Sequence, residues 1–335
     1  MKNSFLKLLI LMSAGAITFA QSVGPSMKAI VVHQYGGPEV LKYEDAPRPD
    51  LKEDEILIRT MAAGVNPVDA YIRSGRYGKG SLPYIPGLEV AGIVEKTGAK
   101  VTKFKAGDPV YAHLNFNGGG YAEFSIATES ETATKPKSIS FEQAAAVPLA
   151  ATTAWQALVD TAGLKSGQTV LIHGGSGGVG HFAVQIAKAR GAKVIATAST
   201  ENQDLLKQLG VDQAIDYTKT KFEEVVKDVD VVLEATRSDS MSRSYGVVKK
   251  GGFIVSVTGP PDQAELDKHG IRGSGMGVHP DAHVLEELAK LIDEKKIVPI
   301  VSQVFPLAEA DKAHRQIETR HTRGKIVLKV AERPK

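Results

Sequence analysis

A glycine-rich segment at residues 174–180, Gly-Gly-Ser-Gly-Gly-Val-Gly, most constrains what this chain can fold into. An apolar strand-like run at 169–173 precedes it, and a helix-like run at 178–190 follows. Because glycine lacks a Cβ, such a turn is tight and lets a pyrophosphate approach backbone N–H groups at a positively polarised helix N-terminus. The Gly-x-Gly-x-x-Gly spacing therefore predicts a dinucleotide-binding loop lined by Gly175, Gly177, Gly178, Val179 and Gly180. A flexible turn without a ligand is the alternative, and the flanking strand and helix disfavour it.

Strand-like and helix-like runs alternate on both sides of this loop, which predicts an α/β fold with a doubly wound parallel sheet. The expected strands are 169–173, 193–197, 214–215, 229–234 and 253–257. The expected helices are 178–190, 201–209, 222–227, 240–248 and 282–295.

The first part of the chain has a different pattern. Short β-branched runs separated by Gly, Pro and Asp turns predict a small barrel-like domain at 27–135, followed by helix at 140–160. A strand at 300–305, a helix at 308–317 and a strand at 325–330 are expected to return to it. The expected domains are therefore 27–150 with 297–335, and 151–296.

Residues 1–26 have the pattern of a secretory signal peptide. Lys2 and Lys7 precede an apolar run that ends in Thr18-Phe19-Ala20, with small residues where a signal peptidase cleaves. The run is short for a permanent membrane span. A periplasmic or secreted protein is expected, or a cytoplasmic one if Met27 is the true start. Export conflicts with the expected scarcity of dinucleotide cofactors outside the cytoplasm, and no twin-Arg pair offers export of a folded protein.

Composition excludes several classes of function. The 335 residues carry a formal net charge of only +3, which gives no reason to expect nucleic acid or an anionic membrane as a partner. Cysteine is absent, so neither a disulfide nor a thiolate ligand or nucleophile is available.

The end of the second strand of the sheet bears on the choice of dinucleotide. Ala198 stands where NAD-binding proteins place an acidic residue for the ribose. Ser199 and Thr200 follow and offer hydroxyl donors to a 2′-phosphate, which favours NADPH. No Arg or Lys comes directly after them, Glu201 is adverse if it points inward, and both hydroxyls are alternatively helix caps.

Several motifs resemble the medium-chain dehydrogenase/reductase superfamily and, within it, the zinc-free quinone oxidoreductase branch. They are Tyr-Gly-Gly-Pro-Glu-Val-Leu at 35–41, Ala-Gly-Val-Asn-Pro-Val-Asp at 63–69, Pro-Gly-Leu-Glu-Val-Ala-Gly at 86–92, Gly-Gly-Tyr-Ala-Glu at 119–123, Thr-Thr-Ala-Trp-Gln-Ala-Leu at 152–158 and Arg-Gly-Lys-Ile-Val-Leu at 323–328. The resemblance covers nearly the whole chain from residue 28 to 330. It implies a GroES-like catalytic domain beside a Rossmann domain, and a homodimer. The strand at 252–257 is expected to end the sheet and to pair with its copy.

The resemblance also implies roles for individual residues. Asn66 is expected to orient the nicotinamide or the acceptor oxygen, with a local turn role as the alternative. Tyr71 on the same loop is expected as a proton donor or a wall, and Arg73 as a brace through a carboxylate. Thr153 is expected beside the nicotinamide, or else as a helix cap, and Tyr217 on the adenosine side.

The zinc ligands of relatives are not matched. Asn66 and Leu88 occupy the positions of a Cys and a His ligand, and Glu89 alone does not make a zinc site. No metal is therefore expected.

Two segments depart from the family pattern. Ala-Thr-Arg-Ser-Asp-Ser at 235–240 replaces a glycine-containing stretch after the strand 229–234, and Arg237 either alters the pocket or supplies positive charge. The glycine-rich stretch 270–276 either lines the substrate entrance or is an ordinary loop.

The sequence therefore favours hydride transfer from NADPH to a small quinone or α,β-unsaturated carbonyl without zinc. The alternative is a catalytically weak NADPH-binding sensor or structural protein of the same fold. NADPH consumption with a panel of quinones and enones distinguishes the two.

Overall fold

Six parallel strands form the sheet that carries the glycine-rich segment. In the computed structural model, which describes residues 25–78, 80–116 and 118–332, their order is β10-β9-β8-β11-β12-β13. Every neighbouring pair is parallel. Their bounds are β8 Thr169–His173, β9 Lys193–Ala198, β10 Gln213–Asp216, β11 Val229–Glu234, β12 Val248–Ser256 and β13 Arg272–Gly275. From β8 the chain adds β9 and β10 on one side, and it then crosses over to add β11, β12 and β13 on the other side. A crevice for a ligand is expected where this order changes, at the carboxyl ends of β8 and β11.

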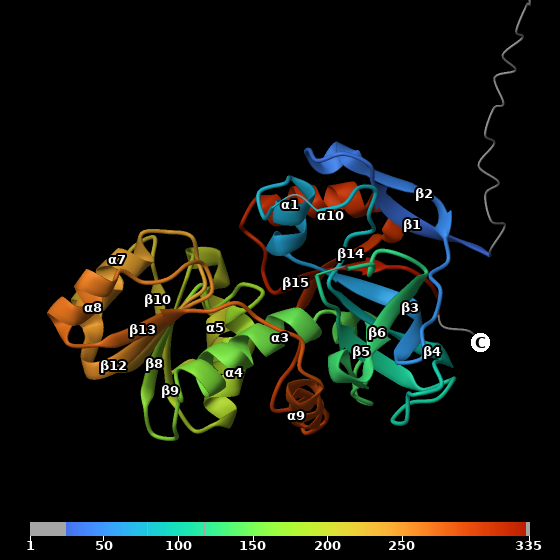
Figure 1. The fold of residues 1–335 in the computed structure, drawn as a ribbon. Helices are drawn as coiled ribbons and strands as arrows, with labels where there is room; N and C mark the ends of the chain where they lie inside the picture. Colours follow the sequence, from blue (N-terminus) through green and yellow to red (C-terminus); the bar gives the residue numbers. More distant parts are fainter. Residues whose placement is uncertain (1–24, 79, 117, 333–335) are drawn as a thin grey trace, which may run out of the picture.

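Short helices connect these strands and cover both faces of the sheet (Figure 1). They are α4 Gly180–Ala189, α5 Gln203–Gln208, α6 Phe222–Val225, α7 Ser240–Ser244 and α8 Gln263–His269. Helix α9, Ala282–Asp293, follows β13 and packs against α3 and β7 at the junction with the other half. Single 3-10 turns precede α5 at Thr200–Asn202 and follow α7 at Tyr245–Val247. The predicted doubly wound α/β fold is confirmed.

The expected end of this sheet was wrong. The strand predicted at 252–257 is the interior strand β12, and β13 lies outside it. The sequence of β13, Arg-Gly-Ser-Gly, has low β propensity, so the pattern predicts a loop there, with or without a role at the substrate entrance. Its glycines have a packing reason, because a Cβ on Gly273 would lie 2.9 Å from the Leu266 and Pro261 side chains, and one on Gly275 would lie 2.9 Å from Pro260.

The other half of the molecule is built on a seven-stranded sheet of order β14-β15-β3-β4-β5-β7, with β6 on β3. The bounds are β3 Glu55–Val65, β4 Glu89–Thr97, β5 Pro109–His113, β6 Phe124–Thr128, β7 Thr132–Thr134, β14 Val301–Pro306 and β15 Lys325–Lys329. The hairpin of β1 Ser26–Val32 and β2 Leu41–Pro47 packs beside it. Helices α1 Pro67–Arg73, α2 Phe141–Ala145 and α10 Ala310–Glu318 accompany this sheet, with 3-10 turns at Pro38–Val40, Glu129–Glu131 and Leu307–Glu309. The C-terminal strands thus return to the first half of the chain, as Figure 1 shows in red beside blue.

The segment after Asn66, predicted as a loop, is instead the helix α1. Pro67 occupies its first turn, where its missing N–H costs nothing, and the Asp69 carboxylate accepts the Asn66 backbone N–H at 2.8 Å. Tyr71 and Arg73 are therefore held on a helix rather than on a loop.

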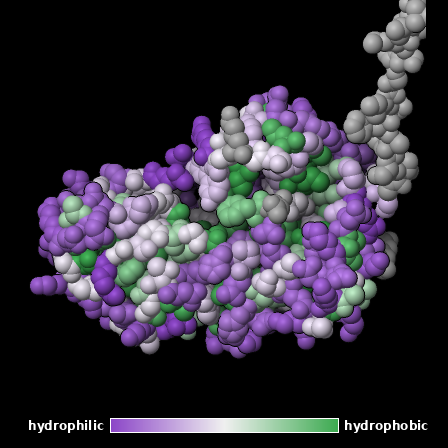
Figure 2. Space-filling view, viewed as in Figure 1, coloured by the Kyte–Doolittle hydropathy of each residue, from purple (hydrophilic) through white to green (hydrophobic). Residues whose placement is uncertain are grey.

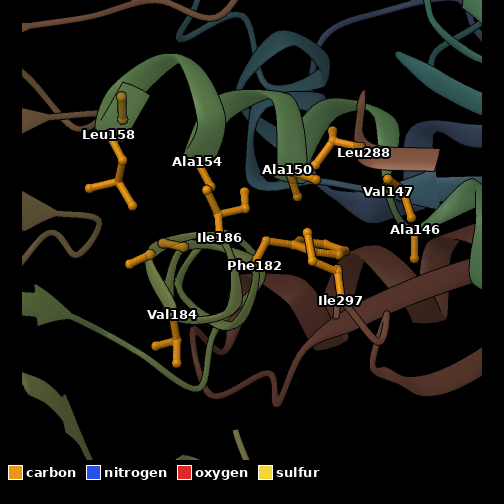
Figure 3. Close-up of a cluster of buried hydrophobic side chains, with 14 of the residues drawn as sticks. Ala146, Val147, Ala150, Ala154, Leu158, Phe182, Val184, Ile186, Leu288 and Ile297 are labelled. Carbon is orange, nitrogen blue, oxygen red and sulfur yellow. The ribbon is translucent and has the colours of Figure 1, made fainter. Parts of the chain in front are cut away.

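The two halves are joined by one apolar core. Helix α3, Pro148–Trp155, continues as a π-helical turn at Gln156–Thr161 and packs along α4. Figure 3 shows Ala150, Ala154 and Leu158 facing Phe182 and Ile186, with Leu288 and Ile297 beside them. Small residues on α3 let the helices approach closely, and Tyr111 on β5 donates a hydrogen bond to the Leu285 carbonyl of α9 at 2.5 Å. This junction positions the two sheets on either side of the cleft.

Candidate functional site

A cleft with a cavity of about 1330 Å³ lies between the two halves, at the carboxyl ends of β8, β9 and β11. Figure 2 shows the face hollowed between the two lobes. The predicted site residues that line the cavity are Asn66, Tyr71, Thr153, Gly177, Gly178, Val179, Gly180, Ser199 and Tyr217. One cavity therefore joins the glycine loop to the residues expected near the acceptor.

The glycine loop is shaped by close backbone approaches. A Cβ on Gly180 would lie 2.0 Å from the Gly174 carbonyl oxygen, so only glycine fits there. A Cβ added to Gly177 or Gly178 would meet no atom closer than 3.3 Å, so the backbone of these two residues is open toward the cleft. His181 at the start of α4 bonds the Gly177 carbonyl at 2.9 Å, and burial lowers its pKa to about 4, so the neutral ring fastens the loop.

Two of the predicted cofactor-binding residues, Gly175 in the glycine loop and Thr200 after β9, do not line the cavity. Gly175 lies beneath the loop, where a Cβ would meet Ala196 at 2.8 Å and Leu206 at 3.0 Å, so it serves the packing of the loop on β9 and α5. Thr200 donates its hydroxyl to the Asp216 carboxylate at 2.6 Å and pairs with Thr218. The Thr200 hydroxyl is thus engaged within the protein. This hydrogen bond stabilises the ionised form of Asp216 and lowers the pKa of its carboxyl to about 2.

The end of β9 forms one end of the cleft. Ala198, Ser199 and Tyr217 line it, and the adverse residue Glu201 also faces it. Neither Ser199 nor Asn202, the residues that precede the two helical turns here, makes a side-chain cap hydrogen bond, so the capping alternative for Ser199 is wrong.

Positive charge reaches this end from a distant part of the sequence. The segment 319–324 between α10 and β15 crosses to the Rossmann half, where Gly324 donates its N–H to the Ser176 carbonyl at 2.8 Å and Arg323 pairs with Asp204 of α5 at 3.1 Å. Arg320 on this segment lines the cavity. Sequence reasoning sought a cation directly after Thr200 and missed Arg320, because only the fold brings residue 320 to this cavity.

At the other end of the cleft, Asn66 belongs to a buried ionic network. Its Nδ2 donates to Glu89 Oε1 at 2.7 Å, while its Oδ1 accepts from the Lys325 ammonium. The same ammonium donates to Glu89 Oε1 at 2.7 Å, and Glu89 Oε2 accepts the Leu149 backbone N–H at 2.7 Å. Asn66 does precede a helix, as the turn alternative expected, but its amide is oriented by groups distant in the chain.

Lys325 is a second residue that sequence reasoning missed. It lines the cavity, and its side chain is only 3% exposed. The motif at 323–328 was recognised as a family signature without a role for its lysine, and nothing in the sequence alone pairs it with residues 66 and 89.

Tyr71 faces the cavity from α1, and the Arg237 guanidinium lies 4.7 Å from the centre of its ring. Thr153 lies within α3 rather than at its start, so the cap alternative is wrong for this residue too. Its hydroxyl donates to the Leu149 carbonyl at 2.7 Å, which directs the methyl group and backbone to the cleft.

A buried chain of polar groups supports α1 from behind. Arg73 pairs with Glu318 at 2.5 Å, as its expected bracing role requires, and also contacts His314 Nδ1 at 3.2 Å. Burial lowers the pKa of His314 to about 3, so its neutral ring bonds Tyr121, and Tyr121 donates to Asp69 at 3.0 Å. Burial also raises the pKa of Asp69 to about 7.

His113 on β5 offers a further polar group. It lines the cavity beside the β4 strand, and its Nδ1 is buried without a partner among the described residues. Burial lowers its pKa to about 4, so the ring is neutral near pH 7.

Neither a metal cluster nor a membrane helix emerges from the described residues. No group of three or more His, Cys, Asp and Glu side chains within 25–78, 80–116 and 118–332 is placed to hold a metal ion. Within the same residues, no helix is both long and apolar enough to cross a bilayer. The predicted signal segment at 1–26 lies almost entirely outside the described residues.

Family models match both halves of the chain. An alcohol dehydrogenase GroES-like domain matches residues 52–137, and a family described as zinc-binding dehydrogenase matches residues 209–328. A barrel-like half, a Rossmann half and a cleft between them define a nucleotide-dependent dehydrogenase or reductase.

Individual relatives narrow the family. The chain is 39% identical to the chloroplastic NADPH-dependent alkenal/one oxidoreductase of Arabidopsis thaliana, over 93% of this chain and 82% of that one. It is 37% identical to the quinone oxidoreductase of Sus scrofa, over 90% of this chain and 97% of that one. The chain belongs to the quinone oxidoreductase branch of the medium-chain dehydrogenase/reductase superfamily.

Solved structures share the fold over their full length. The quinone oxidoreductase from Coxiella burnetii superposes with a TM-score of 0.86 at 37% identity, covering 92% of this chain and 100% of that one. The Escherichia coli quinone oxidoreductase complexed with NADPH gives 0.83 at 33% identity, covering 90% and 100%. The expected GroES-like and Rossmann architecture is confirmed.

Proposed function

We propose that this protein is an NADPH-dependent oxidoreductase that transfers hydride to a quinone or an α,β-unsaturated carbonyl. The observation that carries the proposal is the single cavity that joins the glycine loop to Asn66 and Tyr71. Relatives described as quinone oxidoreductase and as NADPH-dependent alkenal/one oxidoreductase support the substrate class.

The residues around the cleft fit a dinucleotide. The glycine loop, with Gly177 and Gly178 open and the α4 N-terminus behind it, suits the pyrophosphate. Ser199 and Arg320 suit a 2′-phosphate, and Tyr217, whose side chain is 53% exposed, suits the adenosine. When bound, NADPH supplies the hydride from its nicotinamide ring.

The chain's own groups stabilise the charge that develops on the acceptor oxygen. Only one of the two Asn66 amide hydrogens is used by Glu89, so the second is available to a ligand. Lys325 on the Asn66 oxygen polarises the amide and makes that hydrogen a stronger donor. The Tyr71 hydroxyl offers a second donor, and solvent or Tyr71 completes protonation.

The proposed chemistry uses no zinc. Both carboxylate oxygens of Glu89 accept hydrogen bonds, from Asn66, Lys325 and the Leu149 backbone N–H. The Lys325 ammonium provides the positive charge next to this carboxylate. Activity that survives exhaustive chelation, with no zinc found by elemental analysis, is expected. Loss of activity on chelation and its recovery with zinc would contradict this.

We also propose that the protein is a homodimer. One of the two edge strands of the parallel sheet, β13, has no strand on its outer side among the described residues and offers that edge to a second copy. Light scattering at micromolar concentration should give twice the mass of one chain, and a monomer mass would contradict the proposal.

Export is a separate proposal that rests on residues 1–20 alone. Sequencing the N-terminus of the native protein should find cleavage near Ala20. An intact N-terminus at Met27 in a cytoplasmic fraction would contradict it.

The proposed activity is tested by NADPH oxidation with a panel of quinones and enones. We expect turnover with several conjugated carbonyls and little with saturated ketones. Hydride addition to the β-carbon of a conjugated acceptor gives a delocalised enolate that hydrogen-bond donors can stabilise, whereas addition to a saturated ketone gives a localised alkoxide. Tight NADPH binding without turnover of any acceptor would favour a sensor or structural role instead.

A further inference from the structure

The segment 235–240, where the chain departs from its family pattern, forms part of the rim of the cleft. It follows β11 directly, and every one of its residues lines the cavity. Arg237 is exposed, and its guanidinium lies over the ring of Tyr71, 4.7 Å from the ring centre. The contact spans the cleft from one half of the molecule to the other.

A buried carboxylate holds this segment in place. Glu234, at the end of β11, is only 1% exposed. Its Oε1 accepts the backbone N–H and the hydroxyl of Thr236 at 2.7 and 2.6 Å, and its Oε2 accepts the Ser240 hydroxyl at 2.5 Å. The backbone on both sides of Arg237 is therefore held by Glu234, which sets the point on the rim from which the Arg237 side chain emerges.

The charge of Arg237 is not neutralised within the described part of the chain. Arg73 pairs with Glu318, and Arg243 pairs with Glu223 and Asp239, but no carboxylate of the described residues forms an ion pair with Arg237. Stacking on an aromatic face leaves the in-plane N–H groups of a guanidinium free. Arg237 thus presents an unused donor fork to the cleft beside Tyr71.

This cation lies on the acceptor side of the cleft. In the sheet, β8 separates β11 from β9, so the ends of β11 and β9 are two strand spacings, about 10 Å, apart. Ala198 ends β9 and Ser199 comes directly after it, whereas Arg237 follows β11 and contacts α1, the helix that begins after Asn66. Its position therefore suits a group on the acceptor better than the 2′-phosphate.

We infer that Arg237 selects acceptors that carry a carboxylate, so that the preferred substrates are conjugated carbonyl compounds with a negatively charged group. The inference rests on the proposed function and deepens it. A guanidinium fork matches the two oxygens of a carboxylate, and Tyr71 provides a planar wall against the conjugated system.

The test compares two acceptors that differ only in charge, 6-oxohept-4-enoate and its methyl ester. Two methylene groups insulate the enone from the carboxylate, so the intrinsic reactivity of the two compounds is similar. The variant Arg237→Met removes the charge with a side chain of similar length. Arg190→Met is the matched control, because Arg190 is exposed, lies 5.7 Å from the ring of Trp155 and is outside the cavity.

The wild type should prefer the acid to the ester in kcat/KM by about tenfold or more, and Arg237→Met should remove most of that preference. Arg190→Met should keep it, and salt should reduce it, because screening weakens the attraction. Equal use of acid and ester by the wild type, or an unchanged ratio in Arg237→Met, would overturn the inference and leave the proposed function standing.

A binding measurement separates the inference from turnover. Calorimetry on the NADP⁺-saturated protein with 6-oxoheptanoate and its methyl ester should show the same preference for the acid and the same loss in Arg237→Met. If the variant instead weakens NADPH binding and affects acid and ester equally, Arg237 contacts a cofactor phosphate and the inference is wrong. If neither these enones nor any acceptor of the quinone and enone panel is reduced, the proposed function fails, while the calorimetry still decides the role of Arg237.

Discussion

The Lys325 ammonium lies 2.7 Å from the Glu89 carboxylate at a place where the two side chains are 3% and 0% exposed. Asn66, the residue directly before α1, bridges them, so β15, β4 and the start of α1 meet in one charged contact. Burying two charges is costly unless they are paired and fully hydrogen-bonded. We interpret this contact as the device that fixes the Asn66 amide for its role at the acceptor.

Removal of the lysine alone should destabilise the protein. Lys325→Met leaves Glu89 buried without its cation, which should lower the free energy of unfolding by about 3–5 kcal/mol in urea titrations. The double variant Lys325→Met, Glu89→Gln should recover much of this loss, because it no longer buries an unpaired charge. Lys329→Met on the same strand is the control, since Lys329 is 38% exposed and its solvent-exposed pair with Glu332 should contribute little to stability. A loss as small as that of the control would contradict the buried pair.

Asp69 should make stability depend on pH. Burial raises its pKa from 3.8 to about 7, so between these values the folded protein holds a proton that the unfolded chain has released. Stability from this group is complete below pH about 4 and is lost as the pH rises through about 7, by roughly 2–4 kcal/mol. As the pH rises from 4 to 8, the unfolding free energy of the wild type should therefore fall relative to that of Asp69→Asn. A difference that is flat with pH would mean that Asp69 is ionised in the folded state throughout.

Ala198 should govern the choice between NADPH and NADH. Ala198→Asp places a carboxylate at the end of β9, which repels a 2′-phosphate and can accept from the ribose hydroxyls of NADH. We expect weaker NADPH binding and stronger NADH binding, each by about 1–3 kcal/mol, with a smaller NADPH effect at high salt. Ala198→Asn separates charge from size. An unchanged ratio of the two dissociation constants in Ala198→Asp would show that residue 198 does not face the ribose.

Arg320 should contribute to the same preference. Arg320→Met should weaken the binding of NADPH by roughly 1–2 kcal/mol and change the binding of NADH little, because only NADPH carries the 2′-phosphate. Arg315→Met on α10 is the control, since Arg315 is 58% exposed and does not line the cavity. Equal weakening of both cofactors would assign Arg320 to the pyrophosphate or to the structure of the 319–324 segment.

The sequence predicts the Rossmann half well because the relevant signals are local. The run 169–173, the glycine turn and the helix after it are contiguous, and their order follows from strand and helix periodicity. The β11 strand was placed at its observed bounds for the same reason. The sequence does not predict β13, because Arg-Gly-Ser-Gly resembles a loop. Its glycines are required by close contacts with Pro260 and Leu266, which the local sequence does not reveal.

The site was predictable in its members but less so in their contacts. Asn66, Tyr71 and Ser199 were identified and do line one cavity, whereas Lys325 and Arg320 were not given roles. Lys325 acts on residues more than 230 positions away in the chain, and only the pairing of β15 with β3 brings them together. Contacts of this kind depend on the tertiary fold, which residue spacing does not encode.

The most direct test of the proposed chemistry follows the hydride itself. NADPH deuterated at the transferred position is incubated with a small enone, and the reduced product is examined by mass spectrometry. Hydride transfer from cofactor to the conjugated carbon predicts one deuterium per product molecule at the β-carbon. Reduced product without deuterium, or oxidation of NADPH with no reduced product, would contradict direct hydride transfer.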